Sequence, residues 1–187
     1  MTSRQVDSFS WQVDERQADK EICMVGELER GSLSFRKATH EDIPTLKDLF
    51  RETVTTVNRG DYTCEETADW ASCMDSRARW KELIDGMHVV VAVAPSDRIV
   101  GFAAINDEGY LHSMFVHKDC QGQGVATFLL DIMEEYAKRN GINEITSEVS
   151  ITAKPFFERK GYTVITEQKV RANKLYMINY KMGKRLQ

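Results

Sequence analysis

Hydrophobic residues recur along this chain with two different periods. Apolar runs at 87–94, 99–106 and 110–116 have the length and the β-branched content of strands, and short polar turns separate them. From 43 to 57 and from 125 to 139, apolar residues recur instead every three or four positions, which is typical of amphipathic helices. The pattern therefore predicts both helices and strands, with three consecutive strands in an antiparallel meander.

The remaining segments are predicted to form further helices and strands. Residues 32–38 alternate as a first strand does, and Thr39 suits the N-cap of the helix that follows. Two short helices are expected between residues 62 and 83, where Trp70 and Trp80 either pack in the core, the simpler interpretation, or stack on a ligand at a pocket mouth. A strand, a short helix and a final strand pair are expected at 144–149, 152–160, 162–170 and 175–182. The chain is thus predicted to be an α/β protein with a mixed, mostly antiparallel sheet flanked by helices.

The N-terminal segment follows neither period. A chain of 187 residues is long enough for one domain with a full core and short for two, so a single domain at 33–187 is expected. Residues 1–32 are then an N-terminal extension of unknown role. They could form a flexible arm, an added strand or a segment that packs on a neighbouring subunit.

A glycine-containing turn between the strand 110–116 and the helix 125–139 is the strongest candidate for a binding site. The first N–H groups of a helix lack intrahelical partners and attract anions. Gly122 and Gly124 carry no Cβ that would keep a phosphate away from them. Because Val125 follows Gly124, the turn is not a Walker loop, and it lacks the third glycine of a Rossmann turn.

Two motifs in this region resemble those of the GCN5-related N-acetyltransferase (GNAT) family. The family's pyrophosphate loop, Q/R-x-x-G-x-G/A, matches residues 121–126, QGQGVA. Its second motif, N-x-x-A-x-x-F-Y-E-x-x-G-F/Y, matches residues 150–162, with serine and phenylalanine in place of asparagine and tyrosine. The stretches TVxxVNxxDYT and PFFERKGY are similar to those of a bacterial branch of acetyltransferases whose acceptors are mostly unassigned.

The resemblance implies the acyl-CoA N-acyltransferase fold and acetyl-CoA as cosubstrate, with no metal. It also implies a strand that splays from its neighbour, so that free backbone amides bind the pantetheine arm and the acetyl carbonyl. The cofactor-binding residues that it implies are Met114, Phe115, Val116, Gln121, Gly122, Gln123, Gly124, Val125, Ala126, Thr127, Ser150, Phe156 and Phe157.

A base must deprotonate the acceptor ammonium, and His112 is the leading candidate because imidazole titrates near neutral pH. The resemblance supports it, since arylalkylamine acetyltransferases of the family carry a base at the matching position. Period-two alternation predicts that Tyr110, His112, Met114 and Val116 share one strand face. A hydrogen-bonded structural histidine is the alternative, and Glu52 and Tyr110, or a water chain that they hold, would then replace it as the catalytic base.

The general acid is where the chain departs from the family, because Phe157 stands where a tyrosine usually protonates the leaving thiolate. Either Ser150, Tyr162 or Tyr176 replaces it, or the thiolate leaves unassisted. The predicted function is therefore N-acetyl transfer in a ternary complex. A non-catalytic acyl-CoA-binding sensor or interaction module is the alternative that Phe157 keeps open.

Composition narrows the partners and the compartment. The net charge of −4 argues against a general nucleic-acid binder, and no apolar run is long enough to span a membrane. The N-terminus lacks the apolar region of a secretory signal, and the four cysteines form no C-x-x-C pair, so a cytoplasmic location without a metal site is expected. The acceptor is expected to be a small-molecule amine or a protein amine, and a homodimer is possible.

Overall fold

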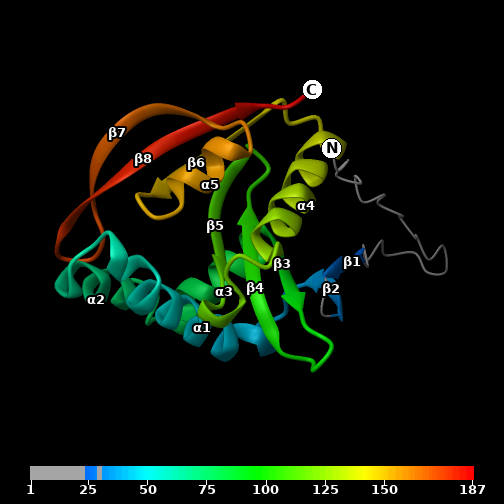
Figure 1. Ribbon diagram of the computed structural model, residues 1–187, viewed down its shortest axis with the longest axis horizontal. Helices are drawn as coiled ribbons and strands as arrows, with labels where there is room; N and C mark the ends of the chain where they lie inside the picture. Colours follow the sequence, from blue (N-terminus) through cyan, green and yellow to red (C-terminus); the bar gives the residue numbers. More distant parts are fainter. Residues whose placement is uncertain (1–23, 29–30) are drawn as a thin grey trace, which may run out of the picture.

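An eight-stranded sheet forms the centre of the protein in the computed structural model, which describes residues 24–28 and 31–187 (Figure 1). Its strands lie in the order β1-β2-β3-β4-β5-β6-β8-β7, and β5 and β6 are the one parallel pair among these described strands. The strands are β1 (Met24–Leu28), β2 (Gly31–Lys37), β3 (His88–Val93), β4 (Ile99–Ile105), β5 (Tyr110–Val116), β6 (Glu144–Ser150), β7 (Thr163–Arg171) and β8 (Tyr176–Arg185). The helices are α1 (Ile43–Thr56), α2 (Cys64–Ser72), α3 (Arg77–Gly86), α4 (Val125–Arg139) and α5 (Lys154–Arg159). The prediction of a mixed, mostly antiparallel sheet flanked by helices is confirmed.

Two hydrophobic clusters cover opposite faces of this sheet. Val89 and Val91 of β3 pack with α1 and α3, whereas Val90 and Ala92 pack with α4. Successive side chains of a strand point to opposite faces, so α1 and α3 cover one face and α4 covers the other. The sheet is therefore a middle layer, as the fully buried strand β4 requires.

The segment before the predicted domain contributes one described strand. β1 lies within residues 1–32 and pairs with β2 in antiparallel register from Met24↔Phe35 to Leu28↔Gly31. Of the three alternatives for the extension, an added strand is what residues 24–28 form. Residues 1–23 lie outside the described part of the chain.

The strands β5 and β6 separate soon after they begin. Their parallel ladder holds only Tyr110↔Thr146 and Leu111↔Ser147, while β6 continues to pair with β8 as far as Ser150↔Asn179. Beyond Leu111, the edge of β5 that faces β6 thus has no strand partner among the described residues. The splayed strand that the family resemblance implied is present, and we call this opening the fork.

A β-bulge at His112 changes the direction of the side chains on β5. Ile105 pairs with Leu111 and the adjacent Ala104 pairs with Ser113, so His112 is an extra residue between them. Met114 packs with the cluster around α4, and Tyr110 lies on the opposite face from Leu111, which packs in that same cluster. The prediction that Tyr110, His112, Met114 and Val116 share one face is therefore wrong, because one inserted residue shifts the alternation by one position.

Candidate active site

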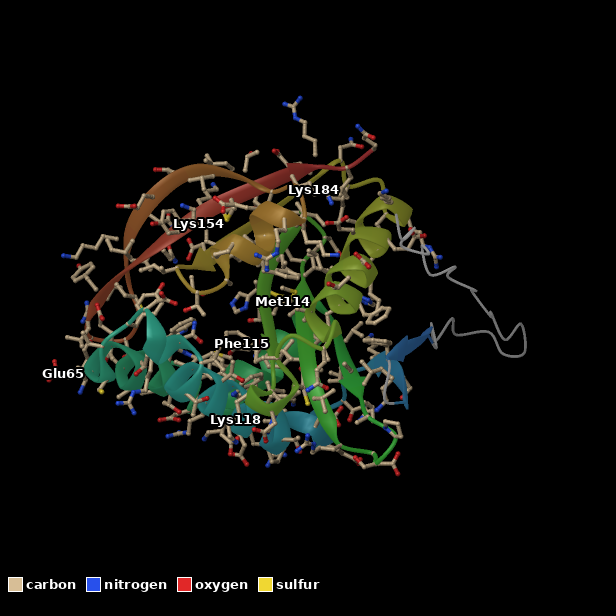
Figure 2. The ribbon with its side chains drawn as sticks, in the orientation of Figure 1. Glu65, Met114, Phe115, Lys118, Lys154 and Lys184 are labelled. Atoms are coloured by element: carbon tan, nitrogen blue, oxygen red, sulfur yellow. The ribbon has the colours of Figure 1, made fainter. Side chains whose placement is uncertain are left out.

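A cavity of about 880 Å³ opens at the fork. β5 and β6 form its floor, α2, α3 and the β7–β8 hairpin border one end, the turn before α4 together with α5 borders the other, and α1 lies beside both. Met114 and Phe115 of β5 lie near the middle of the molecule, between these two ends (Figure 2). The lining includes most of the residues expected from the sequence: Tyr110, His112, Met114, Phe115, Val116, Gln121, Gly122, Gly124, Val125, Ala126, Thr127, Ser150, Phe156 and Phe157.

Two expected residues do not line the cavity. Glu52 lies on an exposed side of α1, where its carboxylate is 2.5 Å from Lys118 Nζ and 3.5 Å from His117 Nε2. The hydrogen bond from Lys118 is the main reason why the pKa of Glu52 is lowered. Gln123 is exposed, and its amide nitrogen donates to the Asp119 carbonyl at 2.9 Å. Glu52 and Gln123 thus both lie outside the cavity lining, and Glu52 is not placed beside His112.

The turn before α4 has the backbone geometry that an anion site requires. Gly122 and Gly124 adopt φ of +70° and +84°, a region that favours glycine, and a Cβ on Gly122 would meet no atom within 4 Å. Gly124 is the N-cap of α4 and offers no side chain to the helix, whose first backbone bond runs from Phe128 N to Gly124 O at 3.1 Å. The amides of residues 125–127 are thus open to a ligand, and a pyrophosphate fits this site.

Gln121 fixes the turn to the end of β5. Its side-chain amide donates to the Val116 carbonyl at 2.7 Å, and the Thr53 hydroxyl donates to the same oxygen at 3.0 Å. These bonds hold the turn and α1 to the last residue of the splayed strand. The opening residue of the glycine motif therefore positions the loop rather than filling the cavity.

His112 lies at the bulge and lines the cavity. Its Nδ1 is 2.7 Å from Ser113 Oγ, and its ring meets the ring of Tyr110 edge to face at 6.0 Å. Burial lowers the pKa of His112 below the ordinary 6.5, against an opposing effect of Glu148. The imidazole is therefore neutral at pH 7 and able to accept a proton. Burial also raises the pKa of Tyr110 to about 12, so this phenol stays protonated and is no base near neutral pH.

Glu148 is a site residue that the sequence alone did not single out. It follows Ser147, which is the last residue of β6 to pair with β5. Among the described residues that line the cavity, Glu148 is the one acidic residue. Its charge acts on both His112 and Tyr110. Alternation within the predicted strand 144–149 was the available signal, because Ile145, Ser147 and Val149 are buried and Glu148 between them is exposed.

Aromatic side chains form the wall between α1, α2 and β5. Phe50 meets Phe115 edge to face at 4.9 Å, and Trp70 lies 6.2 Å from Phe115 and 5.9 Å from Tyr62. Trp80 is fully buried and its indole N–H donates to the Met74 carbonyl at 2.8 Å, so its contribution is packing. The half-buried Trp70 is the tryptophan with a surface free for a ligand.

Of the three hydroxyls expected to replace the missing tyrosine, one lies at the cavity. Ser150 Oγ accepts from Ala153 N at 3.1 Å and lies 3.4 Å from Asn58 Nδ2. Tyr162 is 2% exposed, packs on Phe157 at a ring distance of 5.0 Å and does not line the cavity. Tyr176 is 57% exposed and also lies outside the lining. Ser150 is therefore the one of the three that lines the cavity.

The described part of the chain contains neither a membrane-spanning helix nor a metal cluster. No described helix is long and apolar enough to cross a membrane. Among residues 24–28 and 31–187, no group of three or more histidine, cysteine, aspartate or glutamate side chains is placed to hold a metal ion.

Comparisons with known proteins agree with the fold and the cavity. The Acetyltransferase (GNAT) domain model matches residues 58–184. The N-acetyltransferase YafP of Escherichia coli K12 is 30% identical over 151 residues, which are 81% of this chain and 95% of YafP. The L-methionine sulfoximine/L-methionine sulfone acetyltransferase of Pseudomonas aeruginosa PAO1 is 26% identical over 127 residues, 63% of this chain and 71% of that enzyme.

Solved structures extend this agreement. A GCN5-related N-acetyltransferase from Rhodopseudomonas palustris superposes with a TM-score of 0.79 at 28% identity, covering 81% of this chain and 94% of that one. Other acetyltransferases of the same fold were solved with coenzyme A or acetyl-CoA bound. The chain belongs to the GNAT family and is an acetyl-CoA-dependent N-acetyltransferase.

Proposed function

We propose that the protein transfers the acetyl group directly from acetyl-CoA to an amine while both substrates occupy the cavity at the fork. The observation that carries the proposal is that His112, in the bulge of β5, lines the same cavity as the glycine turn and the aromatic wall. One continuous cavity contains all three, so a base shares the cavity with a place for the cofactor and a place for an acceptor. No covalent enzyme intermediate is needed.

A cysteine acyl carrier is disfavoured by the thiol that lies at the acceptor end. Cys73 lines the cavity, but burial is the main cause that raises its pKa. A raised pKa leaves less thiolate, which is the nucleophilic form. Direct attack by the amine is therefore the simpler route.

The cofactor end supplies binding and polarisation through backbone groups. The open amides at 125–127 bind the pyrophosphate, and the unpaired edge of β5 from His112 to Val116 binds the pantetheine arm. Acetyl-CoA supplies an activated thioester, and backbone N–H groups along this edge stabilise the negative charge that grows on its carbonyl oxygen. Met114, Phe115 and Val116 are the positions that we assign to this contact.

The acceptor amine loses its proton to His112. Glu148 supplies negative charge beside the imidazole and attracts an incoming ammonium, and the neutral imidazole then accepts the proton as the nitrogen attacks. Tyr110 stays protonated and can orient the acceptor. Glu52, which does not line the cavity, has no part in this proposal.

Kinetics with a panel of amines would test direct transfer. Release of free thiol should depend on both acetyl-CoA and an amine, and double-reciprocal plots should intersect. Parallel lines, or acetyl-enzyme trapped in the absence of an amine, would contradict a ternary complex. Binding of acetyl-CoA without turnover of any amine would instead support the sensor alternative, which the comparisons do not favour.

A small-molecule amine is the acceptor that we propose. The Pseudomonas aeruginosa relative is named for acceptors that are amino-acid derivatives, which supports a small-molecule amine over a protein amine here. A cytoplasmic location, the absence of nucleic-acid or membrane partners, and the division into an extension 1–32 and a domain 33–187 stay predictions. So does a homodimer, which light scattering after gel filtration would test.

A further inference from the structure

At the acceptor end of the cavity, α2 is joined to the tip of the β7–β8 hairpin by a set of hydrogen bonds. The Asp69 carboxylate accepts backbone N–H groups from Asn173 at 3.0 Å, Lys174 at 2.8 Å and Leu175 at 2.8 Å. The Asn173 side chain also donates to Ser72 Oγ at 2.9 Å. The hairpin curves from α5 to α2 and ends against it (Figure 1). We call these contacts of Asp69 and Ser72 with residues 173–175 the clasp.

Two arginines are bonded to backbone carbonyls at or beside the clasp. Arg171 Nε donates to the Asn173 carbonyl at 3.1 Å, and Arg79 Nη1 donates to the Cys73 carbonyl at 2.6 Å. Asn173 is itself bonded to Ser72, the neighbour of Cys73, so the clasp brings the two guanidinium groups to the same end of the cavity. Both arginines line it.

Neither guanidinium is paired with a carboxylate within the described residues. The remaining basic residues of the lining, Arg159 and Lys160, follow each other at the end of α5, and Lys160 lies 3.8 Å from the Asp131 carboxylate. Glu148, the acidic residue of the described lining, lies at the fork. Two guanidinium groups without a carboxylate partner thus line the cavity beside the clasp, and the acidic residue of the described lining lies at the fork.

We propose that the acceptor is a free α-amino acid or a close analogue, whose carboxylate binds Arg79 and Arg171 while its amine is directed to His112 and Glu148. The inference rests on the proposed function and names the substrate class of that site. A guanidinium offers a planar pair of donors that matches a carboxylate, and each arginine keeps donors beyond the one that fixes it to the backbone. A side chain of the acceptor would contact the wall formed by Trp70, Phe115 and Tyr62.

The clasp also favours a small acceptor over a protein. A peptide lysine or a protein N-terminus continues into a chain that must leave the site, and the clasp joins α2 to the hairpin beside the place proposed for the acceptor. A free amino acid ends within the cavity. Its carboxylate, which a peptide residue lacks, is the group that two unpaired guanidinium groups would select.

Matched pairs of acceptors would test the carboxylate. The free proteinogenic amino acids are compared with their decarboxylated amines, for example L-phenylalanine with 2-phenylethylamine and L-methionine with 3-(methylthio)propylamine, by release of coenzyme A. We expect kcat/KM to favour the amino acid of the best pair by at least about tenfold. The decarboxylated amine has no carboxylate, so it cannot form the charge-assisted hydrogen bonds that the two guanidinium groups offer. Equal turnover of both members, preference for the amine, or turnover only of other amines would overturn the proposal.

Arginine variants assign the effect to the clasp. Arg171→Met and Arg79→Met should each lower kcat/KM for the amino acid about tenfold or more while leaving the slower rate with the amine within about twofold. Arg77→Met, an exposed residue of α3 outside the lining, is the matched control and should change neither rate. Equal loss with both acceptors would mean that the arginines only support the fold.

Acetyl-CoA binding separates failure of this proposal from failure of the proposed function. Calorimetry should give the same affinity for the wild type and all three arginine variants. Weaker binding in Arg79→Met or Arg171→Met would assign the guanidinium groups to the cofactor and overturn the carboxylate site. No binding by the wild type, or binding with no amine turned over, would instead remove the proposed function.

Discussion

The two ends of the cavity are built in different ways. The cofactor end comes chiefly from one continuous stretch, residues 110–127, and it binds through backbone groups of a splayed strand and of a helix start. The acceptor end is assembled from α1 to α3, β6 and the hairpin, and its closing contact joins Asp69 to Leu175, 106 positions apart. It offers side chains: aromatic rings, one glutamate and two arginines.

This difference has a physical reason. A pyrophosphate site needs only a helix start whose amides no Cβ obstructs, so the same short motif serves any member of the fold. Recognition of an acceptor needs particular side chains at particular distances, and only tertiary contacts produce those distances. Changes at the cofactor end should therefore affect binding of the cosubstrate, and changes at the acceptor end should affect turnover.

The largest effect is expected from a charge placed in the glycine turn. Gly122→Glu should lower the affinity for acetyl-CoA by at least about 100-fold, because a carboxylate at the helix start repels the pyrophosphate and occupies its place. Calorimetric titration with acetyl-CoA measures the effect.

Gly141→Glu is a matched control for this change. Gly141 has φ of +72°, against +70° at Gly122, and neither has an atom within 4 Å of an added Cβ. Both variants carry the same backbone strain, but Gly141 follows the opposite end of α4. If Gly141→Glu weakens binding as much, strain rather than charge is the cause, and the anion site is in doubt.

The same contrast decides what could be predicted from the sequence. The helices and strands were predictable because hydrophobic periodicity records which face each element buries, and the glycine motif located the cofactor end. The bulge at His112 could not be predicted, because an inserted residue leaves no trace in the alternation of β5 itself. It is visible only in the pairing of β5 with β4. The clasp and Arg171 depend on where the hairpin tip docks, which no local pattern records.

His112 joins the two ends, and its loss should slow catalysis without affecting the cofactor. We expect His112→Gln to lower kcat about 100-fold, within the range typical of a lost general base, with unchanged affinity for acetyl-CoA. Steady-state rates at saturating substrates measure it. A fall below about fivefold would leave His112 a structural histidine, the alternative that the sequence kept open.

The pH dependence gives a second test of the same residue. Burial disfavours the protonated imidazole, so the pKa of His112 lies below 6.5 and the active neutral form persists to lower pH than in an exposed histidine. The kcat/KM of the wild type should therefore rise with pH through a midpoint below 6.5 and then level off. That rise should be absent in His112→Gln.

A smaller effect is expected when the clasp is opened. Asp69→Ala removes the acceptor of three backbone N–H groups, so the hairpin tip should dock less often and the KM for the amine should rise about tenfold. The affinity for acetyl-CoA should stay within about twofold, because the turn before α4 is untouched. Glu65→Ala, on the outer side of the same helix (Figure 2), is the control and should leave both constants unchanged. A parallel loss of cofactor binding would mean that the two ends are not separate.

The smallest effect is expected at Phe157, where the family resemblance and the chemistry of the cofactor end point in opposite directions. Phe157 is 3% exposed and packs edge to face against Tyr162 at 5.0 Å and Phe156 at 5.5 Å. If the family's tyrosine were needed here, Phe157→Tyr would raise kcat tenfold or more. We expect a change within about threefold, because a thiol ionises near pH 8.5 and its thiolate leaves readily, with Ser150 as the hydroxyl at hand. Rates at saturating acetyl-CoA and amine distinguish these outcomes, and thermal unfolding shows whether the added hydroxyl has disturbed the packing. A large gain in kcat would show that the cofactor end needs a side chain for the chemical step. Its backbone groups would then suffice for binding acetyl-CoA but not for the reaction.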